Sequence, residues 1–282
     1  MIKYLKEKIR KHKEKRTFKE YGFKIKSFDL PHFGKIRYAQ WLHPSETEKY
    51  ITESNIHFYQ KLSKDGGFII DIGAHTGDTT VPMALAVGKD GLVLALEPNK
   101  YVYAILEKNS KLNSEQTNIH PVDFAATDED GIFTFNYSDA SFCNGGYLSK
   151  INSTRHRHNY TLDVQGRNFE NYLFENYSND LPRLDLIKVD AEGYDKEILK
   201  TIPKIIKHYT PHILVECYKH LTLNERLDLL NTIEQHGYEL YRLEDFTTLN
   251  NLVKLNKSNM TEKKHFEMLA VHRDKKAVIF SS

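Results

Sequence analysis

A glycine loop follows a strongly apolar stretch of the chain. The segment FIIDIGAHTGDTT, residues 68–80, passes through Asp71, Gly73 and Gly77 into a helical pattern. The two glycines let the backbone turn tightly and approach a ligand, and a helix start offers free amide groups. A dinucleotide fingerprint needs Gly-x-Gly-x-x-Gly, and this loop lacks the middle glycine. The loop therefore predicts a nucleotide-like cofactor that has no pyrophosphate.

An acidic residue ends the next expected strand. Glu97 closes LVLALE, residues 92–97, at a position where an acid accepts both hydroxyls of a ribose. Asp71 would repel a phosphate and attract an ammonium or sulfonium group. S-adenosylmethionine has both the adenosine and the cationic groups. We expect Asp71, Gly73 and Gly77 at its methionine end and Glu97 at its ribose.

Further cofactor contacts are expected nearby. Asp123 and Phe124 end the third strand and are candidates for the edge and the face of the adenine. Thr79 could add a hydroxyl at the helix start. Packing or helix capping would explain Phe124 and Thr79 equally well.

Carboxylates follow the next two expected strands, 185–190 and 212–217. Asp190 ends the first, Glu192 comes two residues later, and Glu216 lies near the end of the second. Asp190 or Glu192 could take the proton of a hydroxyl acceptor, orient it or hold the ammonium of the cofactor, and Glu216 could join them. The three could instead hold a divalent cation, but their spacing matches no all-protein cage, so no metal site is predicted.

Other base and acceptor-binding candidates are His75 in the glycine loop and Tyr194. Further candidates lie in a polar segment at 138–168 that is rich in Asn, Gly, Ser and His. Long irregular segments inside compact domains are usually functional or disordered. The segment contributes Arg155, His156, Arg157 and His158, which could bind an anionic acceptor such as a phosphorylated or acidic sugar. A lone loop histidine is more often structural than catalytic.

Alternation of strands and helices from residue 66 onward predicts a doubly wound, mostly parallel α/β sheet over 66–282, with the insertion at 138–168. Residues 1–65 are expected to be an α/β appendage: a basic helix within 1–16, two short strands within 17–44, and a helix from Ser45 to Leu62 opened by a Ser-x-x-Glu capping box. A second capping box, at Thr222 and Glu225, opens another helix.

Composition narrows the class of protein. The chain has 282 residues, 40% of them hydrophobic, and a net charge of +2, which does not signal a nucleic-acid partner. No apolar run has membrane-spanning length and no secretory signal is visible, so a cytoplasmic location is expected. Cys143 and Cys217 are too few for a metal knuckle and unlike a disulfide framework. The basic N-terminus could contact an anionic membrane surface or be a solvated helix.

The chain resembles the FkbM-type methyltransferases, a branch of the class I, Rossmann-like, S-adenosylmethionine-dependent fold. The resemblance covers roughly residues 66–272. It is carried by DIGAHTGDTT (71–80), LEPNKYVYAILEKN (96–109), AATDEDG (125–131), IKVDAEGYDKEIL (187–199), ILVEC (213–217) and FEMLAVH (266–272). It implies a seven-stranded sheet with an antiparallel last strand, and methyl transfer to an oxygen, often a hydroxyl of a sugar or other secondary metabolite. His75 stands where such sequences usually have Asn.

The acceptor is therefore expected to be a small molecule or glycan. A nicotinamide-dependent oxidoreductase would share the sheet and the role of Glu97, but it is disfavoured by the missing glycine. A non-catalytic module that binds S-adenosylmethionine is a further alternative. A nucleic-acid methyltransferase is disfavoured because the block after residue 189 reads Asp-Ala-Glu-Gly, without the Pro-Pro-aromatic sequence typical of exocyclic-amine methylases.

Overall fold

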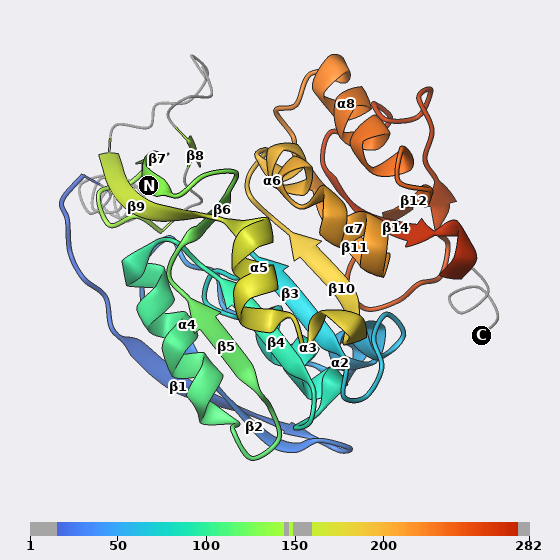
Figure 1. The fold of residues 1–282 in the computed structure, drawn as a ribbon. Coiled ribbons are helices and arrows are strands. Elements are labelled where there is room, and N and C mark those ends of the chain that lie inside the picture. Colours follow the sequence, from blue (N-terminus) through green and yellow to red (C-terminus); the bar gives the residue numbers. More distant parts are fainter. Residues whose placement is uncertain (1–15, 144–146, 149–159, 276–282) are drawn as a thin grey trace, which may run out of the picture.

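The computed structural model describes residues 16–143, 147–148 and 160–275 (Figure 1). Its central sheet has the strand order β13-β12-β14-β11-β10-β3-β4-β5. The strands are β3 (Phe68–Ile72), β4 (Leu92–Leu96), β5 (Ile119–Val122), β10 (Leu184–Val189), β11 (His212–Cys217), β12 (Tyr238–Leu243), β13 (Val253–Lys254) and β14 (Phe266–His272). Neighbours from β11 through β10, β3 and β4 to β5 are parallel, whereas β14 runs antiparallel to β11 and β12. The predicted doubly wound sheet with its antiparallel last strand is confirmed, and the short β13 extends one edge.

The parallel strands are short apolar runs because both faces of the sheet are covered. Every residue of β3 and β4 is buried, as expected for a parallel sheet between two helical layers. Ile69 and Ile70 are neighbours in the chain yet belong to separate hydrophobic clusters, because successive side chains of a strand point to opposite faces.

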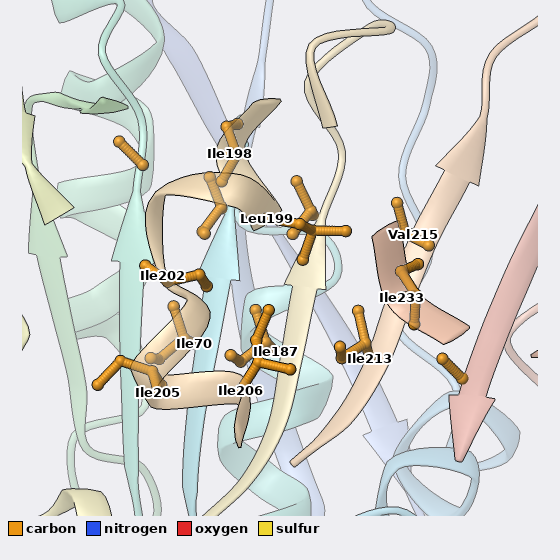
Figure 2. Close-up of a cluster of buried hydrophobic side chains, with 14 of the residues drawn as sticks. Ile70, Ile187, Ile198, Leu199, Ile202, Ile205, Ile206, Ile213, Val215 and Ile233 are labelled. Atoms are coloured by element: carbon orange, nitrogen blue, oxygen red, sulfur yellow. The ribbon is translucent and has the colours of Figure 1, made fainter. Parts of the chain in front are cut away.

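Helices cover both faces of this sheet. They are α2 (Glu53–Gln60), α3 (Thr80–Val87), α4 (Lys100–Leu112), α5 (Phe169–Tyr177), α6 (Asp195–Thr201), α7 (Pro203–Tyr209) and α8 (Leu223–Glu234), with short 3-10 turns η1 (Leu181–Arg183) and η2 (Arg273–Lys275). Helices α5 to α8 pack on one face, and α2 and α3 on the other. In Figure 2 the isoleucines of α7 and of its N-terminal junction, Ile202, Ile205 and Ile206, lie over Ile70 and Ile187 of the sheet. The capping box of Thr222 and Glu225 is present at the start of α8, as predicted.

The N-terminal part forms a hairpin of β1 (Phe23–Leu30) and β2 (Gly34–Trp41). Asn109 of α4 binds the edge of β2: its side chain accepts a hydrogen bond from the Ala39 amide at 2.6 Å and donates one to the Ala39 carbonyl at 3.2 Å. The unpaired edge of the hairpin is thereby joined to α4. The basic helix expected within 1–16 lies almost wholly outside the described residues.

The predicted helix from Ser45 to Leu62 is wrong in its first half. Residues 45–52 are irregular, and α2 begins at Glu53 with Thr52 as its N-cap. The side chain of Gln40 replaces helical hydrogen bonds in this segment. It donates to the Thr47 carbonyl at 3.1 Å and accepts from the Lys49 amide at 2.7 Å. A polar side chain outside the apparent capping box therefore determines the backbone conformation of this segment.

A second, smaller sheet stands beside the central one, with the order β6-β9-β7-β8. Its strands are β6 (Ala125–Thr127), β7 (Gly131–Tyr137), β8 (Tyr147–Leu148) and β9 (Tyr160–Asn168). The segment 138–168 is thus not wholly irregular as expected, because β9 pairs with β7 over seven residue positions from Tyr160 to Gly166. Residues 155–158, which hold four predicted acceptor-binding side chains, lie outside the described part of the chain.

Candidate active site

A cavity of about 340 Å³ lies at the carboxyl ends of β3, β4 and β10. The strand order reverses at β3: β4 and β5 follow on one side of it, and β10 and β11 on the other. Ligands of open α/β sheets bind at such a switch point. The cavity wall combines the glycine loop after β3, the end of β4, the loop after β10, strands β6 and β7, and the irregular segment before α2.

The glycine loop is held very close to the loop after β10. A Cβ atom at Gly73, whose φ is 77°, would collide with the carbonyl oxygen of Asp190. The amides of Gly73 and Ala74 both donate to the Leu96 carbonyl, at 3.1 and 2.9 Å. Only a glycine satisfies both the positive φ and the close approach, so the first loop glycine is required by the geometry of the cavity floor.

Asp71 does not line the cavity, contrary to its predicted place at the methionine end of the cofactor. Its side chain is fully buried, and its carboxylate lies 3.2 Å from the ammonium of Lys188. The hydroxyls of Thr80 and Thr79 donate to its other oxygen at 2.7 and 3.2 Å. Thr79 lines the cavity, but its side chain makes no capping hydrogen bond. Asp71 therefore stabilises the loop from within.

Lys188 lies between two carboxylates. Its ammonium is 3.2 Å from Asp71 and 3.4 Å from Asp190. Burial alone would lower the pKa of Lys188, but these two carboxylates raise it well above its ordinary value. Lys188 is therefore a charged structural cation, and it holds Asp190 at the cavity wall.

Glu97 is positioned as a ribose-binding acid should be. It lines the cavity, and its two oxygens accept hydrogen bonds from the amides of His75, at 3.1 Å, and Asn99, at 2.9 Å. Burial raises the pKa of Glu97, while His75 and the amide of Asn99 oppose that rise. The fixed carboxylate leaves lone pairs for two hydroxyl donors from a ligand.

His75 has a φ of 48°, and its imidazole Nε2 is 3.2 Å from the Cys143 carbonyl and 3.9 Å from Glu46. The ring is thus directed at the wall formed by the irregular segment and by Cys143. Its backbone amide is the part that serves Glu97.

The irregular segment before α2 contributes cavity residues that the sequence analysis missed. Glu46 Oε1 and Ser45 Oγ are buried and have no hydrogen-bond partner among the described residues, and both side chains line the cavity. Lys49 is at ion-pair distance, 3.5 Å from Glu46 and 2.9 Å from Asp78. Buried polar atoms without hydrogen bonds are costly. The ammonium of Lys49 offsets part of this cost at Glu46 Oε1, and a ligand with donor groups would supply the missing hydrogen bonds.

Another part of the cavity wall is apolar and aromatic. Phe124 is buried there and meets the Tyr172 ring edge to face at a centroid distance of 4.7 Å. Tyr137 and Asn99 were also missed from the sequence. The apolar and aromatic lining includes Leu96, Pro98, Val102, Phe124, Ala125, Ala126 and Tyr137. An aromatic base fits such a wall. Asp123 is exposed and does not line the cavity.

Two carboxylates face the cavity from the loop after β10. Asp190 is about half-exposed, and Glu192 has a φ of 52°, which is rare for a residue with a side chain. Burial and the neighbouring Asp190 raise the pKa of Glu192, and a hydrogen bond from Tyr218 opposes the rise. The loop is fixed by Asp195, which accepts from the amides of Ala191 at 3.0 Å and Gly193 at 2.9 Å.

The predicted site residues that the structure describes fall into two groups. The cavity brings together Gly73, His75, Thr79, Glu97, Phe124, Asp190, Glu192 and Tyr194. It is not lined by Asp71, Gly77, Asp123 or Glu216. Gly77 has a φ of 91° and packs against Leu106, so its role is in the turn. Glu216 lies beside His265, away from the cavity lining.

S-adenosylmethionine fits the residues present. Glu97 would hold the ribose, the apolar end around Phe124 would hold the adenine, and the close approach of Gly73 leaves room for the methionine part. Glu46 Oε1, which makes no hydrogen bond and has the ammonium of Lys49 at 3.5 Å, would suit a second ammonium group.

Comparison with known proteins shows the family of the chain. The sequence model of the Methyltransferase FkbM domain matches residues 71–240. Because that match covers more than half of the chain, the protein belongs to the FkbM methyltransferase domain family. It is an S-adenosylmethionine-dependent methyltransferase, and the oxidoreductase alternative is set aside.

Similar proteins include the methyltransferase sdnD of Sordaria araneosa, which is 23% identical over 196 residues, 62% of this chain and 74% of that protein. Among solved structures, the methyltransferase FkbM of Methylobacillus flagellatus KT is 15% identical, with a TM-score of 0.45 over 75% of this chain and 47% of that one. Fibrillarin of Aeropyrum pernix with bound S-adenosyl-L-methionine is 12% identical, with a TM-score of 0.45 over 91% and 100%. In the described part of this chain, no helix has the length and apolar character needed to cross a membrane.

Proposed function

We propose that the enzyme transfers a methyl group to a hydroxyl oxygen of a small-molecule or carbohydrate acceptor. The observation that carries this proposal is the pair of carboxylates, Asp190 and Glu192, at the cavity wall. An oxygen acceptor must lose its proton on methylation, and a nearby carboxylate can accept it.

The two carboxylates have different environments. Asp190 is held beside the ammonium of Lys188 at 3.4 Å. Glu192 is more deeply buried, and its pKa is raised by that burial and by Asp190. A base whose pKa lies nearer neutrality is the more effective general base. We therefore assign proton removal to Glu192 and orientation of the acceptor hydroxyl to Asp190.

Tyr194 is the remaining predicted acceptor contact on the cavity wall, at the N-cap of α6. S-adenosylmethionine, when bound, supplies a methyl group on a sulfonium that an oxygen nucleophile can attack. The protein's part is to hold the acceptor oxygen in line with that methyl and to remove its proton.

The test is a screen of hydroxylated acceptors, sugars and glycoconjugates among them, with S-adenosylmethionine and detection of S-adenosylhomocysteine, followed by identification of the methylated atom by NMR. Glu192→Gln should lower kcat by about 10²- to 10⁴-fold while cofactor affinity stays within a few-fold. Glu197→Gln, an exposed carboxylate on α6, is the matched control and should keep full activity. Methylation at nitrogen or carbon would contradict the proposal. Full activity of the double variant Glu192→Gln/Asp190→Asn would also contradict it.

A further inference from the structure

A second group of ligand-type side chains lies at the same edge of the central sheet as the cavity. Glu216 of β11 and Glu267 of β14 are direct cross-strand partners, and His265 comes just before β14. One ligand atom from each of these three residues lies within 4.8 Å of the other two. The imidazole Nδ1 of His265 is 3.2 Å from Glu216 Oε1. None of the three lines the cofactor cavity.

Glu216 is the strongest sign that this group binds something. The residue is only 7% exposed, and its Oε2 has no hydrogen-bond partner in the described part of the chain. A buried carboxylate oxygen without a partner is costly, and like-charged residues directly opposite each other across two strands repel. A ligand that supplies positive charge would remove both penalties.

The surrounding charge is strongly acidic. The carboxylates of Asp190, Asp195, Glu192 and Glu267 are all close enough to act electrostatically on Glu216. Asp190 and Asp195 act in the same way on Glu267, and Lys188 opposes them. Lys188 is itself shared between Asp71 and Asp190, so the acidic groups outnumber the nearby buried cation.

We propose that Glu216, His265 and Glu267 form a binding site for a divalent transition-metal cation. One imidazole nitrogen and two carboxylates are ligands that suit Mn²⁺ or Zn²⁺. Three protein ligands leave further coordination positions for water or for an oxygen of the acceptor. The cation would lie close to Asp190 and Glu192, which line the cavity.

A consequence follows for the reaction, and this part rests on the proposed transfer to oxygen. A divalent cation lowers the pKa of a hydroxyl bound to it and so helps Glu192 to remove the proton. Cation binding itself does not depend on which atom is methylated, and it can be measured without any acceptor.

The test is a titration of chelator-treated, full-length protein with MnCl₂, in which EPR measures the free Mn²⁺. A parallel titration with ZnCl₂ is measured by calorimetry. Wild type should show a single saturable site. Glu216→Gln, Glu267→Gln and His265→Ala should each weaken it at least 10-fold, the range seen when a metal site loses a supporting group. Glu262→Gln, an exposed acid close in sequence that pairs with Arg242, is the control and should bind as wild type does.

Folding of the variants is followed by thermal unfolding. Metal-free Glu216→Gln should unfold no lower than metal-free wild type, because it loses an unpartnered buried carboxylate. Mn²⁺ should raise the Tm of wild type and of the control, but not that of Glu216→Gln. The side chain of His265 is 49% exposed, so His265→Ala should fold in any case. The proposal is overturned if wild type binds neither cation saturably, or if His265→Ala binds both as wild type does.

Discussion

The ammonium of Lys188 lies 3.2 Å from the carboxylate of Asp71, and both side chains are buried under the cofactor loop. The two residues sit opposite each other in the register of β10 and β3. This buried pair links the strand that leads to the glycine loop with the strand that leads to Asp190 and Glu192.

Lys188→Met should therefore destabilise the protein strongly. It leaves the Asp71 carboxylate buried without its cation, and breaking a buried ion pair in this way costs about 3–5 kcal/mol. Urea unfolding measures the loss. Lys188→Met combined with Asp71→Leu should recover a large part of it, since no buried charge is left alone. Equal stability of Lys188→Met and wild type would contradict this role.

Gly73→Ala should abolish cofactor binding or folding. The added Cβ would collide with the Asp190 carbonyl in a backbone conformation of φ 77°, and strain of this kind costs about 1–3 kcal/mol before the collision is counted. Gly22→Ala, where nothing lies within 4 Å of the added atom, is the matched control. Circular dichroism melts and S-adenosylmethionine titration report the two effects. Wild-type cofactor affinity in Gly73→Ala would show that the loop is more adaptable than described.

Glu46→Gln should weaken S-adenosylmethionine binding by about 10-fold or more, as expected for a lost charge-assisted hydrogen bond. The buried Oε1 of Glu46, a cavity residue, makes no hydrogen bond within the described part of the chain, and its nearest cation is Lys49 at 3.5 Å. Glu48→Gln, two residues away and paired with Lys26 at the surface, should leave the affinity unchanged. Calorimetry measures both. Equal effects of the two substitutions would remove Glu46 from the cofactor site.

Stability should fall in mild acid through His212. Burial, and then repulsion by Lys275, lowers the pKa of His212 from 6.5 to about 4. Between these pH values the unfolded chain binds a proton that the folded protein does not, so the free energy of unfolding decreases as the pH falls. The full loss is on the order of 3 kcal/mol. His212→Gln should flatten this part of the profile, measured by urea unfolding from pH 7 to 4, and His208→Gln on the exposed face of α7 should not. A profile unchanged by His212→Gln would refute the assignment.

The sequence was sufficient for features encoded locally. The apolar runs before Gly73, Glu97 and Asp190 define strand ends, and parallel strands bring such ends to one edge of a sheet. The seven-stranded sheet with an antiparallel last strand came from the resemblance to a family. The structure has the antiparallel β14 and adds the short β13 as an eighth strand.

Long-range partners were not predictable. Asp71 was expected to meet the cofactor, but it forms an ion pair with Lys188, 117 residues away. That ion pair depends on the register of the sheet, which could not be predicted from the sequence. Glu46 was missed because Ser45 and Glu48 form an apparent capping box, whereas the side chain of Gln40 takes up the backbone groups of that segment. Glu216 was grouped with Asp190, but the register of β14 places it opposite Glu267.

The most direct test of the cofactor site is calorimetric titration of wild type and Glu97→Ala with S-adenosylmethionine, S-adenosylhomocysteine and NAD. We predict saturable binding of the first two by wild type, none of NAD, and a loss of at least 10-fold in affinity in Glu97→Ala, whose carboxylate would otherwise accept both ribose hydroxyls. Binding of NAD alone, or unchanged affinity for S-adenosylmethionine in Glu97→Ala, would contradict the site described above.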